Sequence, residues 1–310
     1  MHHRTLGSTP VMVSEIVLGT WGLAAKSYGK LDAALFDATV RAAWDAGVTT
    51  YDLAGVWGDG ESERRTANAL GDHLSDAVLI TRVGQNKIDG RVVGQFDPTQ
   101  IIRDVDLSLA RLGRQSIDVL LLHNPPAKLL GSSYPLKGLL HLAEAGKVRA
   151  WGASVASVED GRLAVRMGAK VLCIAHNLLA PDDFNELAGL AKDEGIGLLA
   201  RSTLAYGMLA GAWTKETKFG EDDHRARRWE PEAFAARLER VEKLRFLVKE
   251  PIADLATAAL RFALASPLIA GAIVGARTPE QIQHAARASV GMPAMSPEDL
   301  GALAKLAAAP

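Results

Sequence analysis

Short apolar runs of strand-like length alternate with amphipathic stretches of helical period along almost the whole chain. The segment before the first run has turn residues at 7–10, which predict a hairpin. The apolar runs lie at 15–19, 49–53, 77–81, 118–123, 148–154, 170–176, 196–201 and 268–275. Because parallel strands covered by helices show this alternation, eight strand–helix units are predicted.

The stretches between these runs predict the covering helices. They lie at about 35–46, from about 62, from about 98, and at 136–145, 157–167, 181–194 and 253–265. A charge-rich stretch at about 212–231, followed by a helix at 232–250, is interpreted as an insertion before the eighth strand. The whole pattern predicts an α/β fold, a (β/α)8 barrel that residues 1–310 form as one domain.

Composition and charge narrow the classes of function. Lysine and arginine number 35 against 36 acidic residues, so the net charge of −1 offers no basic surface to nucleic acid or anionic lipid. The single cysteine, Cys173, excludes an internal disulfide and favours a reducing, cytoplasmic location. No apolar stretch is long enough to span a bilayer, and the histidines lack the spacing of metal ligands. We therefore expect no metal, no membrane and no nucleic-acid partner.

Several segments, spread over almost the whole chain, resemble the aldo-keto reductase family. They are RTLGSTPVMVSEIVLGTWGL, YDLAGVWGDGESE, ITRVG, SLARLGRQSIDVLLLHNP, GKVRAWGAS, LAYGMLAG, DDHR and IVGARTPEQI. Each falls at an expected loop between a strand and its helix, where barrel enzymes build their active sites. The resemblance implies NADPH-dependent carbonyl chemistry, carried by a tetrad of Asp, Tyr, Lys and His without a glycine-rich dinucleotide motif.

Two members of that tetrad match the family, and two depart from it. Asp52 and His123 stand at the family's carboxylate and histidine. Trp57 replaces the tyrosine, and its indole N–H donates hydrogen bonds but keeps its proton near neutral pH. Arg82 replaces the lysine and stays charged, which predicts a fixed ion pair with Asp52 or an anion-holding surface. His123 and His176 are then the candidate acid–base groups.

The resemblance also implies a nicotinamide site that is changed in this chain. Ser154 matches a serine that bonds the carboxamide. Val155 and Cys173 stand where the family has an asparagine and a glutamine for the same purpose, and His176 stands where a tyrosine stacks on the ring. Each buried amide left unpaired costs about 1–3 kcal/mol, so the ring is expected to bind loosely.

The positions that correspond to the family's phosphate and adenosine site match the family more closely than those at the nicotinamide end do. Small and apolar residues match the pyrophosphate loop: Ser202, Leu204, Ala205, Gly207 and Leu209. In the segment GARTPEQ, Gly275 precedes Arg277, which matches a residue that grips the 2′-phosphate, and Gln281 matches an adenosine contact. Ala285 replaces an asparagine that contacts adenine. NADP(H) is therefore the expected cofactor.

Three functions are compatible with these residues. The first is NADP(H)-linked oxidation or reduction of a carbonyl or hydroxyl group of a small molecule, with His123, His176 or water replacing the missing acid. The second is a non-redox lyase, dehydratase or isomerase that uses the two histidines as acid and base and Arg82 to hold an oxyanion. The third is a protein that senses NADP without catalysis. Loop aromatics favour an apolar or ring-bearing ligand, namely Trp21, Tyr28, Trp57 and Trp213; the oligomeric state is not indicated.

Overall fold

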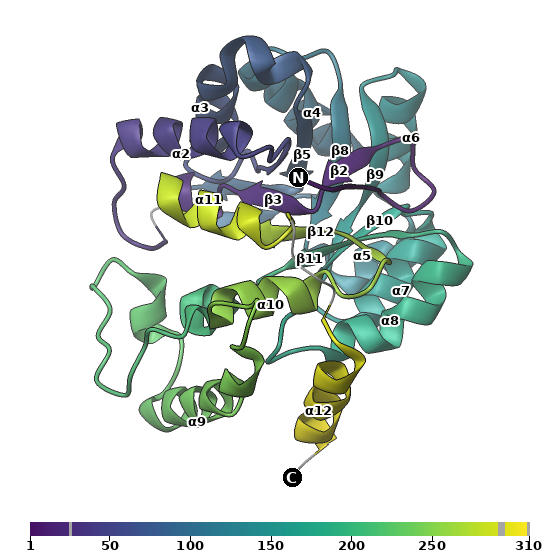
Figure 1. Cartoon of the computed structure of the whole chain (residues 1–310). Helices are drawn as coiled ribbons and strands as arrows, with labels where there is room; N and C mark the ends of the chain where they lie inside the picture. The colour runs from purple at the N-terminus through teal and green to yellow at the C-terminus, as the bar shows by residue number, and fades with distance from the viewer. Residues whose placement is uncertain (25–26, 291–294, 309–310) are drawn as a thin grey trace.

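Eight parallel strands close into a barrel in the computed structural model, which describes residues 1–24, 27–290 and 295–308 (Figure 1). The strands are β3 (Ile16–Gly19), β4 (Thr50–Asp52), β5 (Val78–Val83), β8 (Ile117–His123), β9 (Val148–Ser154), β10 (Val171–Ala175), β11 (Gly197–Arg201) and β12 (Ile269–Val274). They follow one another around the barrel in chain order, and β12 pairs with β3 to close it. The predicted (β/α)8 barrel is confirmed.

Helices surround this barrel and occupy the segments beside it. They are α1 (Trp21–Ala24), α2 (Ala33–Asp45), α3 (Glu61–Leu70), α4 (Pro98–Leu112), α5 (Ala127–Ser132), α6 (Leu136–Glu144), α7 (Val158–Met167), α8 (Asp182–Asp193), α9 (Pro231–Glu242), α10 (Leu255–Ala263), α11 (Pro279–Arg287) and α12 (Pro297–Ala308). Several begin at side-chain caps; Asp97, for example, accepts a hydrogen bond from the backbone N–H of Gln100, with Pro98 in the first turn. Among the described residues, no helix combines the length and apolarity that crossing a membrane requires.

Alternate residues of the strands divide between two apolar layers. In β8, Val119 and Leu121 pack inside the barrel with Ile80 of β5, whereas Leu120 and Leu122 pack against the helices. Because both faces of β8 are buried, its residues Val119–Leu122 are apolar at consecutive positions and do not alternate with polar residues. This explains why the runs could be recognised from the sequence as parallel strands.

The predicted N-terminal hairpin is formed by β1 (His3–Thr5) and β2 (Met12–Ser14), which pair antiparallel. Leu6, Val11 and Val13 join the apolar cluster inside the barrel. The Arg4 guanidinium donates to the carbonyls of Ser266 and Ile269, at the amino end of β12. The hairpin therefore closes the amino end of the barrel and leaves the carboxyl ends of the strands to form the mouth.

Several features differ from the prediction. The insertion helix, predicted at 232–250, ends earlier: α9 is Pro231–Glu242, and a separate 3-10 turn, η4, covers Arg245–Leu247. Leu247 in this turn packs in a third apolar cluster with Leu255 of α10. The helices α5 and α12 were not predicted either. In addition, β5 is followed by an unpredicted antiparallel hairpin of β6 (Gln85–Ile88) and β7 (Arg91–Gly94).

Candidate active site

A buried ion pair joins two neighbouring strands at the mouth of the barrel. Asp52 ends β4, and Arg82 lies on β5. The Arg82 Nε donates to Oδ1 of Asp52 at 3.0 Å, and Nη2 donates to Oδ2 at 3.0 Å. Only 4% and 3% of the two side chains is exposed, so the pair is shielded from water and salt. The ion pair predicted from the two residue types is present.

Burial sets the electrostatics of this pair. It raises the pKa of the Asp52 carboxyl, and the attraction of Arg82 opposes that rise. Burial also works against the charged guanidinium of Arg82, but the Asp52 carboxylate outweighs it, so the pKa of Arg82 lies above its ordinary value. Arg82 therefore stays charged at every pH at which the protein is folded, and it cannot exchange a proton.

Trp57 and His123 complete a group of four at the mouth. Trp57 lies in the loop between β4 and α3, with its ring centre 5.5 Å from the Arg82 guanidinium. His123 ends β8, and its ring meets the indole edge-on, with centres 5.9 Å apart. Residues from three strand ends, far apart in the sequence, are thus brought together where the family resemblance expects a tetrad.

His123 is held in its neutral form. Burial, followed by the positive charges of Arg82 and Arg201, lowers its pKa to about 3. Its Nδ1 is buried and has no hydrogen-bond partner in the structure. A neutral imidazole can orient a substrate oxygen through a hydrogen bond, but it is not a charged acid near neutral pH.

His176 lies apart from this group. It is 3% exposed, and its ring packs against Phe184 and Phe262, at centre distances of 4.7 and 5.0 Å. Burial lowers its pKa to about 4. Within the described ranges, no hydrogen bond, ion pair or ring contact joins it to Asp52 or His123, so the two histidines do not form an acid–base couple by direct contact.

Because His123 and His176 are neutral in the folded protein, we expect the protein to lose stability at acidic pH. Their ordinary pKa is near 6.5, so between that value and about 3 to 4 the unfolded chain binds more protons than the folded chain. The free energy of unfolding is therefore expected to fall as the pH drops below 6.5. His123→Gln and His176→Gln should each reduce the slope between pH 6 and 5 by about 1.4 kcal/mol per pH unit, as measured by urea unfolding. Unchanged slopes in both variants would contradict this account.

At the nicotinamide end, the matched side chains already have protein partners. The Ser154 hydroxyl donates to Oδ1 of Asn124 at 2.8 Å, which uses its one hydrogen. The Cys173 thiol accepts from Nη2 of Arg82 at 3.4 Å. Val155 has no polar side chain; its carbonyl accepts from Arg201 at 2.9 Å, and its backbone N–H donates to the Cys173 carbonyl at 3.1 Å. These residues do not offer the hydrogen bonds by which the family holds the carboxamide.

Arg201 is a residue of the mouth that the sequence comparison with the family did not single out. It ends β11, and its side chain passes the neighbouring β10 to reach Val155 beyond the end of β9. Its Nε is buried without a hydrogen-bond partner. The signal was available, because Arg201 ends an apolar strand run in the same way as Asp52 and His123 do.

The loop that resembles the pyrophosphate segment has an unusual backbone. Ser202, Ala205 and Tyr206 have φ values of 57°, 46° and 63°, and Gly207 has 100°. L-residues rarely adopt this left-handed region, and such residues gather at ligand-binding loops. The Thr203 hydroxyl donates to the carbonyl of Ile273 and anchors the loop to β12.

The residues expected at the adenosine end are engaged with neighbouring loops. The Arg277 guanidinium donates to the carbonyls of Tyr28 and Gly29, at 2.6 and 3.3 Å, and its Nε is buried without a hydrogen-bond partner in the part of the chain that the structure describes. The Gln281 side chain accepts from the backbone N–H of Arg277. A 2′-phosphate would therefore compete with the Tyr28 carbonyl for Arg277.

The loop aromatics pack mainly on protein groups. Trp21, Tyr28 and His224 meet one another at ring-centre distances of 4.7 to 5.2 Å. Trp213 meets Phe219 at 4.9 Å. The backbone N–H of His224 also donates to the carbonyl of Ser27 at 2.7 Å, which ties the insertion to the loop after β3. These contacts join two loops that border the mouth.

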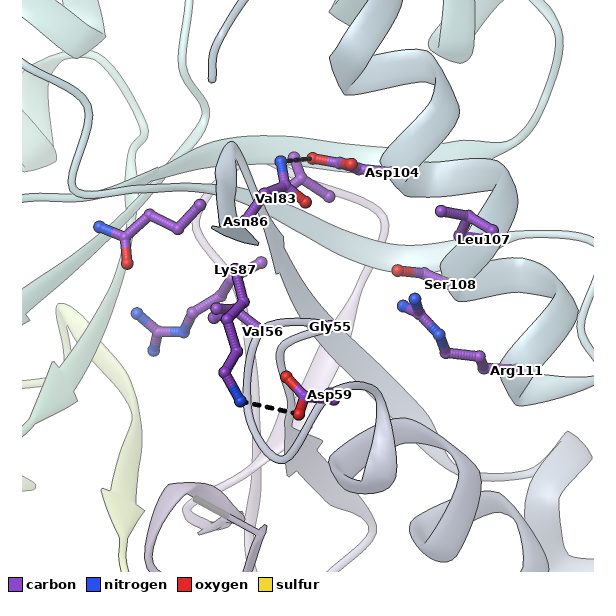
Figure 2. Close-up of a pocket in the computed structure, with 12 residues that line it drawn as sticks. Gly55, Val56, Asp59, Val83, Asn86, Lys87, Asp104, Leu107, Ser108 and Arg111 are labelled. Carbon is purple, nitrogen blue, oxygen red and sulfur yellow. Dashed lines mark hydrogen bonds and ion pairs between the residues drawn. The ribbon is translucent and has the colours of Figure 1, made fainter. Parts of the chain in front are cut away.

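A polar pocket of about 200 Å³ lies beside Arg82, between the loop after β4, the β6–β7 hairpin and α4 (Figure 2). Figure 2 shows Lys87 and Asp59 turned toward each other, and their ion pair measures 2.9 Å. Asn86 donates to Asp104 at 3.1 Å, and Arg111 pairs with Glu63 at 2.9 Å. The charges around this pocket are therefore matched by protein partners. It was not predicted, because the hairpin that forms one wall was not predicted.

Comparison with known proteins agrees with this geometry. The sequence profile described as "Aldo/keto reductase family" matches residues 15–308. The aldo-keto reductase YhdN of Bacillus subtilis is 29% identical over 290 residues, covering 91% of this chain and 87% of that protein. Pyridoxal 4-dehydrogenase of Microbacterium luteolum is 25% identical, with 91% of each chain covered.

Among solved structures, a glycerol dehydrogenase from Gluconobacter oxydans superposes with a TM-score of 0.86 at 24% identity, covering 99% of this chain and 95% of that one. The holo form of an aldo-keto reductase from Bacillus halodurans gives a TM-score of 0.83 at 21% identity, covering 99% and 96%. At such identities the two superpositions establish the fold alone. The family profile covers nearly the whole chain, and this protein therefore belongs to the aldo/keto reductase family of oxidoreductases.

Proposed function

We propose that this protein is an NADP(H)-linked oxidoreductase that acts on a carbonyl or hydroxyl group of a small organic molecule without a tyrosine general acid. The observation that carries the proposal is the meeting of Asp52, Arg82, Trp57 and His123 at the mouth of a barrel of this family. Fold alone does not fix chemistry, so the roles rest on these side chains.

Each of the four residues has a role that its surroundings allow. His123, neutral and with a free Nδ1, orients the reacting oxygen through a hydrogen bond. Arg82 holds Asp52 and adds positive charge near the place where negative charge develops on that oxygen. Trp57 contacts Arg82 and His123 and forms one wall of the site. Water delivers the proton, because none of the four is a tunable acid near neutral pH.

The cofactor assignment to NADP(H) rests on the phosphate end. The left-handed loop around Ala205 and Tyr206, together with Arg277 and its unpartnered Nε, supports a phosphate-bearing ligand. The residues at the nicotinamide carboxamide positions do not support this assignment, because the side chains of Ser154 and Cys173 already have protein partners. We therefore assign no catalytic step to the dinucleotide and expect its reactive end to be held loosely.

Calorimetric titration with NADPH and NADP, followed by a panel of aldehydes, ketones and alcohols, tests the proposal. We expect micromolar binding and substrate-dependent oxidation of NADPH. Arg277→Gln should weaken NADPH about tenfold and leave NADH unchanged, since loss of one charged hydrogen bond costs about 1.5–3 kcal/mol. Absence of binding at millimolar NADPH would overturn the proposal. Turnover without any cofactor that disappears in His123→Ala would replace it with a non-redox reaction.

A further inference from the structure

Two guanidinium groups and one carboxylate share the mouth of the barrel. Arg82 and Asp52 satisfy each other through two hydrogen bonds. Arg201 reaches across from the end of β11 and influences Asp52, His123 and Cys173 electrostatically. Because His123 is held neutral there, the three charged side chains leave one positive charge in excess. These three side chains therefore carry a net positive charge on a chain whose overall net charge is −1.

Because Arg82 is paired with Asp52, Arg201 carries the positive charge in excess. Its Nη2 donates to the carbonyl of Val155, a neutral acceptor, and its Nε is buried with no hydrogen-bond partner among the described residues. Asp183, at the start of α8, lies within electrostatic reach, but no ion pair joins it to Arg201 in the part of the chain that the structure describes. A buried, unsatisfied N–H on a cation is costly, and an oxyanion is the partner that best satisfies it.

A second unpartnered group lies at the same mouth. The Nδ1 of His123 is also buried without a partner, and the Arg201 guanidinium is near enough to lower the pKa of that imidazole. By contrast, the charged groups around the pocket of Figure 2 pair with one another. Two of the buried polar atoms that lack a hydrogen-bond partner among the described residues therefore lie at the mouth.

We propose that the barrel mouth selects a substrate that carries a carboxylate, and that Arg201 is the specificity-determining residue that binds this carboxylate. The inference rests on the proposed oxidoreductase function and specifies its substrate class. A guanidinium matches the planar fork of a carboxylate. A single negative charge balances the one positive charge in excess, whereas a phosphate dianion would leave the mouth negative. The substrate is therefore a small oxo or hydroxy acid rather than a phosphate ester.

Binding of benzoate and benzamide, which differ in charge but share a ring and nearly the same shape, tests this proposal by calorimetry without any cofactor. Benzoate should bind at least about tenfold more tightly than benzamide, as expected for a charge-assisted hydrogen bond in a shielded site. Arg201→Gln should abolish the preference, and Arg201→Lys should retain part of it. Arg166→Gln, at an exposed ion pair on α7, is the matched control and should leave the preference unchanged.

Each outcome decides between the proposals. Equal binding of benzoate and benzamide, or a preference that survives in Arg201→Gln, would overturn the carboxylate site. Tighter binding of inorganic phosphate than of benzoate would overturn the choice of carboxylate. If Arg201→Gln does not fold, the comparison of Arg201→Lys with the unaltered protein still tests the proposal, because the charge remains and the fork is lost. Since no cofactor is present, these results are independent of whether NADPH is turned over.

Discussion

Arg82→Met is expected to lower the free energy of unfolding by about 3–5 kcal/mol, the cost typical of removing one partner of a buried ion pair. The substitution leaves the Asp52 carboxylate buried without its two guanidinium hydrogen bonds. Only 3% of the Asp52 side chain is exposed, so water cannot replace them. Urea unfolding at pH 7.5 measures the change.

The pH dependence of the same variant provides a second measurement. Without Arg82, burial raises the pKa of Asp52 unopposed by its main partner, so the folded state keeps a proton that the unfolded state releases above its ordinary pKa. The destabilisation of Arg82→Met should therefore be smaller at pH 5 than at pH 8. Asp52→Asn combined with Arg82→Met should cost less than the sum of the single changes.

A matched exposed pair provides the control. Arg166 pairs with Glu159 at 3.0 Å, with more than half of both side chains exposed, and Arg166→Met should change stability by less than about 1 kcal/mol. A similar decrease in the free energy of unfolding of Arg82→Met and Arg166→Met would mean that the buried ion pair stabilises the protein no more than the exposed pair does. A loss below about 1 kcal/mol in Arg82→Met would contradict the prediction outright.

Trp57→Tyr combined with Arg82→Lys is expected to raise carbonyl reduction about 100-fold, at the lower end of what general acid catalysis contributes. The Trp57 ring already lies 5.5 Å from the Arg82 guanidinium and 5.9 Å from the His123 ring, so a phenol at this position would lie between them. A lysine beside Asp52 would lower the pKa of that phenol and make it a proton donor. The measurement is kcat/KM for NADPH oxidation with an aldehyde panel.

The phenylalanine variant separates the hydroxyl from the change of shape. Trp57→Phe with Arg82→Lys provides a ring and the lysine but no acid, and it should stay at the rate of the unaltered protein. The tyrosine variant should also gain a basic limb in its pH profile that the phenylalanine variant lacks. Equal rates in the two double variants would show that the missing acid does not limit the reaction.

The strands and most helices could be predicted because each leaves a local signature. Within the run at 117–123, positions 119–122 are apolar in succession, as is typical of a strand buried on both faces, and Asp97 with Pro98 marks the start of α4. The β6–β7 hairpin lacks such a signature, because most of its residues are exposed and its polar and apolar side chains are mixed. At the early end of α9, Leu247 packs in one cluster with Leu255, a contact that no local pattern encodes.

The candidate site was predictable only in part. Asp52 and His123 follow strands, and the Asp52–Arg82 pair follows from opposite charges on neighbouring strand ends. The sequence does not indicate which residues form hydrogen bonds with one another across the mouth. The Ser154 bond to Asn124 and the reach of Arg201 past β10 arise from the parallel pairing of β8 to β11, which sets the carboxyl ends of these strands side by side.

The N-terminal hairpin has a consequence for how the chain acquires its shape. Arg4 bonds the carbonyl of Leu264, 260 positions further on, and Leu6 fills the same apolar cluster as Ile273. During synthesis, these first residues cannot form their contacts until nearly the entire polypeptide has been made. Contacts of such long range slow folding and leave apolar surface exposed until they form. Because exposed apolar surface promotes aggregation, chaperones are expected to assist the folding of the nascent chain.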